Sequence, residues 1–551
     1  MRLLTNALAA GAYFSLLLAL LVLDLNINTA FSLGSWIRLA LFLMATYGVL
    51  AAIVVLMIAL IYRFFTERRA LVPFLSPSFL MLAFSFLTLI FLVIFRENYL
   101  HFLSFFVPEI QALLRTQMLA LFVLAIAGVV LHYRHHHLNP GKLDFTAFFA
   151  LTGAVLALAA VQRFGYPSPP KAYKLANIEA KTLEKRVTVL CLEGLNLEMI
   201  LPLANERKLP NFSWLMKEGA WGRLDAFTPS DPYVLTATFN TGKLPGKHRR
   251  ISDIKYRIPG LKPHLEVVPR FILFRQLSRI SLMAILPNED KPVVKDIWRI
   301  MEESKASAVR MDGPFAPPSG ARAPNPRADK LFLSTFADHQ DEASWIFSQV
   351  KQAFLRDAMS EEQAFQAKTE LQPQVFSLLL DGALTAEMYF HKYSFPGEFG
   401  DIPPDEIRKY GTVIEKYYRY YDQIISKYLA SLRDGDLFIV YSPHGVEPLP
   451  FWKRVVEWAL GNASVSSYHE QAPPGVAFLY GKGIVKGRAF EAVRLVDMAP
   501  TLLYYLGLPV GKDMDGIVTG SLFERSFTDE NPVLTITSYE DASIKKKGVR
   551  S

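Results

Sequence analysis

An acid, a group of hydroxyls and a histidine stand where an α/β fold gathers its chemistry. Glu193 closes an apolar stretch, Val187–Gly194, that reads VTVLCLEG and is rich in β-branched residues. Such a run predicts a strand buried on both faces of a parallel sheet, and ligands of these sheets gather at the carboxyl ends of the strands. Glu193 is therefore the first candidate for chemistry. A polar strand end followed by a turn glycine explains the same residues without chemistry.

The hydroxyls lie in the segment Phe227–Arg250, at Thr228, Ser230, Thr236 and Thr238. A hydroxyl presented at a helix start after a strand is a plausible nucleophile, because backbone N–H groups there stabilise a phosphate. A capped helix with solvent-facing threonines is the alternative interpretation. His444 follows a further apolar run and has the same strand-end position as Glu193.

The elements that must position these residues alternate between strand and helix patterns. Strands are predicted at Val187–Gly194, Val375–Leu380, Leu437–Gly445 and Gly475–Ile484, and helices at Pro210–Glu218, Glu342–Ser360, Ile407–Leu432 and Val496–Pro509. This alternation predicts an α/β domain with a mainly parallel sheet. The tyrosines of Ile407–Leu432 are expected to be packing residues.

The first third of the chain carries most of its hydrophobic excess. Five apolar segments are each near the ~20 residues that a membrane-spanning helix needs, and they are Leu3–Leu23, Trp36–Ile61, Val72–Ile94, Leu113–Leu131 and Phe145–Val161. The first lacks a clear small-residue cleavage site, and four more spans follow it, which favours an anchor over a signal peptide. No ionisable group stands at mid-span, which argues against an ion-coupled carrier.

Basic residues in the short loops predict the orientation of the spans. Arg63, Arg68 and Arg69 lie between spans two and three, and Arg134 and Lys142 between spans four and five. By the positive-inside rule these loops are cytoplasmic. Five crossings then place the remainder of the chain outside a plasma membrane, in the periplasm of a Gram-negative cell.

The predicted organisation has four parts. They are a transmembrane domain over 1–164, a linker over 165–185, an extracytoplasmic domain over 186–525 with a cap inserted over the sheet at about 256–330, and a C-terminal tail over 526–551 that is expected to be solvated after Pro532. The net charge of +8 is spread along the chain, without the basic stripe that nucleic-acid binding needs. The single cysteine, Cys191, excludes a disulfide framework.

The order of these motifs resembles the alkaline phosphatase superfamily, in its type I phosphodiesterase/nucleotide pyrophosphatase branch. The matching pieces are the strand ending in Glu193–Gly194, LPNFSWLMKEGA, TGKLPGKH, YSPHG, His469 and VDMAPTLLYYLGLP. The resemblance implies an alkaline phosphatase-like fold. Five spans before such a domain are also similar in architecture to lipid A phosphoethanolamine transferases and lipoteichoic acid synthases, which is an analogy.

The resemblance implies two divalent metals, usually zinc, six metal-binding side chains and a Ser or Thr nucleophile. Glu193 stands where the family has Asp. The nucleophile falls at Pro232, with Ser230 and Asp231 beside it as the candidate nucleophile region. His444 and His469 remain as histidine ligands.

Other ligand positions carry residues that cannot bind such a metal. The family's Asp-x-x-x-His falls at Leu384 and Met388, and the Asp of its Ser-Asp-His-Gly falls at Pro443. Leu, Met and Pro do not ligate a hard or borderline cation. Glu193, His444 and His469 are then remnant ligands, and we expect no cofactor unless the protein is active, in which case it needs zinc or another divalent metal.

Three hypotheses follow. The first is an inactive phosphatase-like domain that binds or scaffolds, with membrane lipids, an envelope protein complex or a phospholipid or glycan ligand as partners. The second is an active phosphodiesterase or phosphotransferase on lipid or glycan headgroups, with a site rebuilt from Glu193, Asp231, Asp381, Glu387, His391, His444 and His469. The third is a transporter or assembly factor in which the membrane part matters most.

Overall fold

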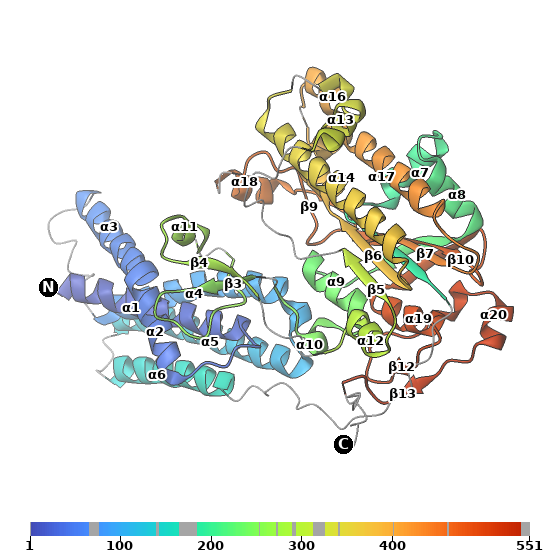
Figure 1. Cartoon of the computed structure of the whole chain (residues 1–551). Coiled ribbons are helices and arrows are strands. Elements are labelled where there is room, and N and C mark those ends of the chain that lie inside the picture. Colours follow the sequence, from blue (N-terminus) through green and yellow to red (C-terminus); the bar gives the residue numbers. More distant parts are fainter. Residues whose placement is uncertain are drawn as a thin grey trace. The chain divides into compact units, whose positions relative to one another are not determined.

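The computed structural model (Figure 1) describes most of the chain, and it divides into two compact units. The described residues are 2–65, 77–138, 143–164, 185–252, 254–270, 274–288, 294–311, 325–339, 342–400, 402–459 and 462–540. One unit, here called the membrane unit, comprises Met1–Lys171 and Ile251–Lys291. The other, the α/β unit, comprises Ala172–Arg250 and Pro292–Ser551.

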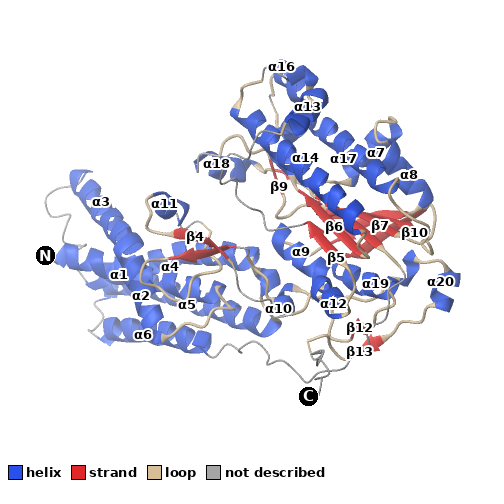
Figure 2. Cartoon of the chain, viewed as in Figure 1, coloured by secondary structure: helices blue, strands red, loops and turns tan. Residues whose placement is uncertain are grey.

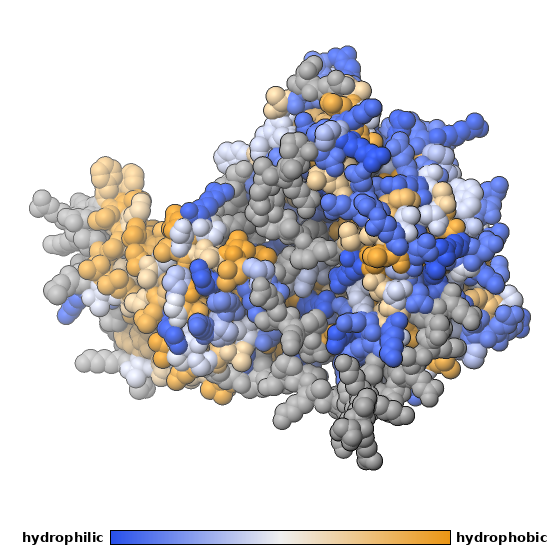
Figure 3. Space-filling view, viewed as in Figure 1, coloured by the Kyte–Doolittle hydropathy of each residue, from blue (hydrophilic) through white to orange (hydrophobic). Residues whose placement is uncertain are grey.

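The membrane unit contains five helices that are long and apolar enough to cross a bilayer: Arg2–Leu25, Leu33–Ile61, Ser78–His101, Pro108–His135 and Phe145–Arg163. The second of these joins α2 (Leu33–Leu43) to α3 (Val49–Phe65) through one π-helical turn. The others correspond to α1 (Arg2–Leu25), α4 (Pro77–His101), α5 (Pro108–Leu138) and α6 (Leu143–Phe164). Figure 3 shows hydrophobic side chains concentrated over this unit. The five predicted spans are confirmed, and the chain is a multipass membrane protein.

A short insertion from the middle of the chain packs with these helices. Its strands β3 (Ile254–Arg257) and β4 (Ala284–Pro287) form an antiparallel hairpin. The Asn26 side chain, just after α1, accepts hydrogen bonds from the backbone N–H groups of Glu266 (2.8 Å) and Val267 (2.9 Å).

Asn98 of α4 anchors the same insertion at a second point. Its side-chain oxygen accepts a hydrogen bond from the backbone N–H of Arg270 at 2.7 Å, and its amide donates to the Arg270 carbonyl at 3.2 Å. These contacts correct the expectation of a cap over the sheet at about 256–330. Ile251–Lys291 belongs to the membrane unit, and the later part of that range enters the α/β unit.

The α/β unit is built on a seven-stranded sheet with the order β11-β2-β10-β7-β1-β6-β5. The strands are β1 (Val187–Leu192), β2 (Ala220–Asp225), β5 (Ala308–Met311), β6 (Val375–Leu380), β7 (Leu437–His444), β10 (Pro474–Gly481) and β11 (Arg488–Arg494). Within this sheet β10 pairs antiparallel with β7 and β2, while the other pairs are parallel. The predicted mainly parallel α/β fold is confirmed.

Helices cover both faces of the sheet (Figure 2). On one face Leu190 and Leu192 of β1 pack with α8 (Pro210–Glu218), α14 (Trp345–Leu371), α15 (Gly382–Ser394) and α17 (Val413–Leu429). On the other, Val189 and Cys191 pack with α9 (Pro232–Thr241), α12 (Ile297–Glu303) and α19 (Met498–Tyr505). Successive side chains of a strand point to opposite faces, so a strand buried on both sides is apolar throughout.

The predicted helix Ile407–Leu432 is divided into α16 (Pro404–Tyr410) and α17. Tyr417, Tyr418, Tyr421 and Tyr428 of α17 are fully buried, which confirms their predicted packing role.

The prediction of a solvated segment after Pro532 is wrong for the part of it that the structure describes. β13 (Thr535–Ile536) pairs with β12 (Val510–Gly511), and Tyr539 is buried. The Glu540 carboxylate bonds the buried Lys243 ammonium at 2.7 Å, which holds the segment to the domain. The Lys545–Lys547 run and the linker over 165–184 lie outside the described residues.

Candidate functional site

Three candidate residues stand at one edge of the sheet because the strands that carry them are parallel neighbours. β1 pairs with β6 on one side and with β7 on the other. Glu193 follows β1, Asp381 follows β6 and His444 ends β7. The Glu193 N–H donates to the Leu380 carbonyl at 2.9 Å, which extends the ladder to the strand ends.

Glu193 is completely buried, and neither carboxylate oxygen has a hydrogen-bond partner among the described residues. Burial raises the pKa of its carboxyl well above the ordinary value, and the negative charges of Asp381, Asp231 and Asp357 raise it further.

The backbone after Glu193 requires a glycine. Gly194 has φ of +91°, and a Cβ there would meet the Leu384 nitrogen at 2.6 Å. The strand end is therefore pressed against the start of α15.

His444 is also buried, with one ring nitrogen unused. Its Nδ1 donates to the Gly445 carbonyl at 2.8 Å, while its Nε2 has no partner in the part of the chain that the structure describes. Burial, together with the neighbouring His469, lowers the pKa of His444 to about 3. Because Nδ1 carries the proton, the neutral ring presents a bare lone pair at Nε2.

The structure brings His469 and Ser230 together, but through the serine backbone. His469 Nδ1 donates to the Ser230 carbonyl at 2.6 Å, and its ring centroid lies 5.2 Å from that of His444. The buried Ser230 hydroxyl donates to the Phe227 carbonyl at 3.4 Å. His469 is therefore not oriented by this contact to take a proton from the Ser230 hydroxyl.

Asp231 caps the helix that follows. One of its carboxylate oxygens accepts a hydrogen bond from the Val234 N–H at 3.2 Å, and Pro232 is the first residue of α9. Asp and Pro are favoured at these two positions for helix geometry alone. The capped helix start of the alternative interpretation is present, but its solvent-facing threonines are not, because Thr238 is buried and bonds the Val234 carbonyl at 3.0 Å.

Two further acids of the rebuilt-site hypothesis already have partners. Asp381 forms an ion pair with Arg356 at 3.1 Å. The buried Glu387 contacts His391 Nδ1 at 3.0 Å and accepts from the Tyr418 hydroxyl at 3.2 Å. His391 and Glu387 are one helical turn apart on α15, so this pair satisfies itself locally.

A buried acid that sequence reasoning missed lies behind this edge. Asp357 of α14 accepts hydrogen bonds at one carboxylate oxygen from the hydroxyls of Tyr417 and Tyr421, both at 2.9 Å, and from the Gly382 N–H at 3.1 Å. Burial, and then the charge of Asp381, raises the pKa of Asp357 to about 7. In the sequence, the only indication of this acid was the four-residue spacing of Tyr417 and Tyr421, which puts both hydroxyls on one face of a helix.

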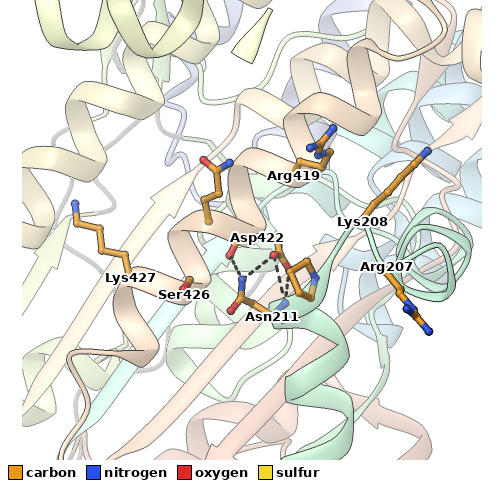
Figure 4. A pocket seen from close by; sticks show the side chains of 9 residues that line it. Arg207, Lys208, Asn211, Arg419, Asp422, Ser426 and Lys427 are labelled. Carbon is orange, nitrogen blue, oxygen red and sulfur yellow. Dashed lines mark hydrogen bonds between the residues drawn. The ribbon is translucent and has the colours of Figure 1, made fainter. Parts of the chain in front are cut away.

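A separate cavity of about 600 Å³ opens between α8 and α17 (Figure 4). Asp422 is one of the residues that line it, and its carboxylate accepts hydrogen bonds from the backbone N–H groups of Asn211 (3.0 Å) and Phe212 (2.9 Å). Two lysines that line the cavity form ion pairs, Lys208 with Glu415 and Lys427 with Glu361. The LPNFSWLMKEGA motif thus has a structural role here, since Asp422 fixes the start of α8.

The side chains present do not fit the six-ligand, two-metal set that the resemblance implies. Pro232, Leu384, Met388 and Pro443 offer no oxygen or nitrogen ligand. Within the described ranges no group of three or more His, Cys, Asp or Glu is placed to hold a metal ion. Among the candidate residues that the structure describes, the buried side-chain atoms without a hydrogen-bond partner are the two Glu193 oxygens and His444 Nε2 at the strand ends, and the Thr236 hydroxyl on α9.

A match to a known protein family shows to which family this chain belongs. The type I phosphodiesterase/nucleotide pyrophosphatase family matches residues 187–493, which is more than half of the chain. The chain belongs to this family. The family is metal-dependent and forms part of the alkaline phosphatase superfamily, as the sequence motifs predicted. No curated protein matches the chain by sequence.

Solved structures of distant proteins are similar to this chain. Human ectonucleotide pyrophosphatase/phosphodiesterase 5 is 12% identical and aligns over 62% of this chain and 100% of its own, with a TM-score of 0.37. A phosphonate monoester hydrolase from Silicibacter pomeroyi is 14% identical and aligns over 62% of this chain and 76% of its own, also with a TM-score of 0.37.

Proposed function

We propose that this protein is an inactive, membrane-anchored member of its family whose phosphodiesterase-like domain binds a ligand or partner in the cell envelope. The observation that supports this proposal most directly is the state of the strand-end residues. Ligand positions are occupied by proline and aliphatic side chains, and Asp231, Asp381 and Glu387 are engaged in a helix cap, an ion pair and a histidine contact.

The two unused polar groups suggest the chemistry of the ligand. His444 Nε2 is a lone-pair acceptor, and Glu193 supplies carboxyl oxygens in a neighbourhood that contains Asp231 and Asp381. Buried polar groups without partners are costly and are satisfied when a donor reaches them. A hydroxyl or ammonium group suits both, whereas a phosphate anion would meet acids. The ligand class we propose is therefore a hydroxyl- or amine-bearing lipid or glycan headgroup.

The charges of the loops between the spans support an orientation of the chain in the membrane. The loop between the second and third spans carries Arg63, Arg68 and Arg69, and these charges favour a cytoplasmic loop. This supports an α/β unit that lies outside the plasma membrane. In a Gram-negative cell this compartment is the periplasm. A binding or scaffolding role there accounts for a folded, membrane-tethered domain without a two-metal centre.

Metal analysis of the purified full-length protein, combined with turnover of bis(p-nitrophenyl) phosphate, tests the loss of catalysis. We expect substoichiometric zinc and no turnover after addition of zinc or manganese. Stoichiometric zinc with turnover that is lost in His444→Ala, and kept in the matched variant His248→Gln, would overturn the proposal. His248 is a suitable control because it is a buried histidine bonded to Thr238 at 3.0 Å.

Ligand binding is tested by the melting temperature of the protein in the presence of ethanolamine, glycerol and inorganic phosphate. A ligand that binds only the folded state raises the melting temperature. We expect stabilisation by ethanolamine or glycerol that disappears in Glu193→Met, and none by phosphate. Stabilisation by phosphate alone contradicts the proposed ligand class.

The second candidate function, phosphodiester hydrolysis or transfer at a rebuilt site, is favoured by one observation. Asp231 and Asp381 lie near enough to Glu193 to raise the pKa of its carboxyl, so these acids share one edge of the sheet. A metal that displaced Arg356 from Asp381 would gather them. The metal and turnover measurements above separate this candidate from the first.

A further inference from the structure

The α/β unit carries a short helix whose apolar face is exposed. The helix α18 (Phe451–Ala459), labelled in Figure 1, follows β8 (Glu447–Pro448) and precedes β9 (Ser467–Tyr468) along the chain. Its exposed side chains are Phe451 (74%), Trp452 (53%), Val455 (50%) and Trp458 (71%). Spacings of one, four and seven residues put all four on one side of an α-helix. Three aromatic rings and a valine thus form one face, here called the aromatic face.

The cationic side chains of α18 hold the helix to its own domain. The Lys453 ammonium pairs with the Glu470 carboxylate at 2.9 Å and lies 3.8 Å from the centre of the Tyr468 ring. The Arg454 guanidinium lies 5.5 Å from the centre of the Phe399 ring. The two cations also lie beside the aromatic face, Lys453 at 5.8 Å from the centre of the Trp452 ring and Arg454 at 5.9 Å from that of Phe451, and both rings remain more than half exposed.

An exposed face of this composition has a defined chemical preference. Trp and Phe beside Lys and Arg are characteristic of helices that lie in the interface of a bilayer, where the rings enter the headgroup region. A soluble surface normally scatters its large apolar side chains singly.

A bilayer is available to this helix because the same chain spans one. Five helices of the membrane unit are long and apolar enough to cross a membrane. A tethered bilayer is present at a high effective concentration, so a face of four apolar side chains is enough for a reversible contact.

We propose that α18 is a membrane-interface helix that inserts Phe451, Trp452, Val455 and Trp458 into the surface of the bilayer that the chain spans. The proposal is independent of the proposed function, because it holds for an inactive domain and for an active one. It also has a consequence for the candidate site. Glu470, the partner of Lys453, adjoins His469, and its carbonyl accepts from the Ser230 N–H at 3.0 Å. A bilayer contact at α18 therefore acts on the segment that carries His469 and brings lipid headgroups to that segment.

The test uses the full-length protein in nanodiscs of phosphatidylcholine and phosphatidylglycerol. In a Cys191→Ala background, which removes the single native cysteine, Val455→Cys and Trp458→Cys are each labelled with an environment-sensitive fluorophore. Leu371→Cys is the matched control, because Leu371 is an exposed apolar side chain of α14 in the same unit. Quenching by phospholipids with brominated acyl chains then reports contact with the apolar part of the bilayer.

We expect brominated lipid to reduce emission at position 455 or 458 about twofold relative to the Leu371 label, since interfacial helices lie ~5–10 Å into the headgroup and acyl boundary. Two positions are used so that one poorly folded variant does not decide the result. Quenching at neither position overturns the proposal. Blue-shifted emission without quenching also overturns it, because a protein partner or a second copy then covers the aromatic face.

Discussion

Glu193 and Asp357 are two buried acids beside the same edge of the sheet, and their surroundings differ. Asp357 receives three hydrogen bonds on one oxygen, from Tyr417, Tyr421 and the Gly382 backbone. Glu193 receives none on either oxygen among the described residues. Both carboxyls have raised pKa values because burial disfavours the charged form.

The difference separates an acid that supports the fold from one that does not. A hydrogen bond to a buried polar group contributes modestly to stability, whereas leaving that group without a partner costs about 1–3 kcal/mol. Asp357 therefore organises α14, α15 and α17 around itself. Glu193 weakens the folded state, which is the expected signature of a residue kept for a ligand or left over from one.

The largest effect is expected at Asp357. Asp357→Ala leaves two tyrosine hydroxyls and one backbone N–H buried without their acceptor, so we expect the α/β unit to lose about 3 kcal/mol of stability. A fall in its melting temperature measures this loss. An unchanged melting temperature would mean that Asp357 does not organise these helices, and that it contributes no more to the stability of the fold than Glu193 does.

The pH dependence of stability should also trace to Asp357. Its pKa in the folded chain is about 7, while the ordinary value is about 4, so the folded state retains a proton that the unfolded chain releases. The contribution is complete below the lower value and is lost as pH rises through the upper one. Asp357→Asn should therefore flatten the fall in melting temperature across this range. Parallel curves for both proteins would contradict the assignment.

Glu193 should respond in the opposite direction. Glu193→Met removes a buried carboxyl that has no partner and keeps a side chain of similar size, so we expect a gain of about 1–2 kcal/mol. Glu387→Met is the matched control, because Glu387 contacts His391 and Tyr418, and it should lose stability. The melting temperatures of the two variants show whether each substitution raises or lowers the stability of the protein. Destabilisation by both would show that Glu193 supports the fold after all.

The smallest effect distinguishes two tyrosines on α17. The Tyr418 hydroxyl contacts the Gly194 carbonyl at 2.8 Å and the Asn196 N–H at 3.2 Å, next to Glu193. The buried Tyr420 hydroxyl has no partner among the described residues. We expect Tyr418→Phe to cost about 1 kcal/mol and Tyr420→Phe to cost nothing, as seen in melting temperatures. Equal effects would show that burial alone, and not the hydrogen bond, decides them.

The sequence predicts the central part of this fold because the central strands are apolar on both faces. β1, β6 and β7 were predicted within one or two residues of their ends. Three outer strands, β2, β5 and β11, were missed because short or partly exposed strands have weak patterns. The insertion Ile251–Lys291 was predicted as part of a cap over the sheet, since hydrogen bonds to Asn26 and Asn98 leave no periodic signal.

At the candidate site, identities were predictable and orientations were not. Glu193 and His444 lie at neighbouring strand ends because parallel pairing puts them there. The contact of His469 with the Ser230 carbonyl, and the role of Asp357, depend on residues brought together from distant parts of the chain. Such pairings are set by tertiary packing, which leaves no local mark in the sequence.

The insertion Ile251–Lys291 also determines how the protein comes apart. The chain passes between the two units three times, after Lys171, after Arg250 and after Lys291. A protease that cuts only the first connection leaves the α/β unit attached, because its own chain continues into a hairpin held by Asn26 and Asn98. Shedding of the domain as a soluble fragment therefore requires cuts at all three connections, and the fold resists release by a single nick.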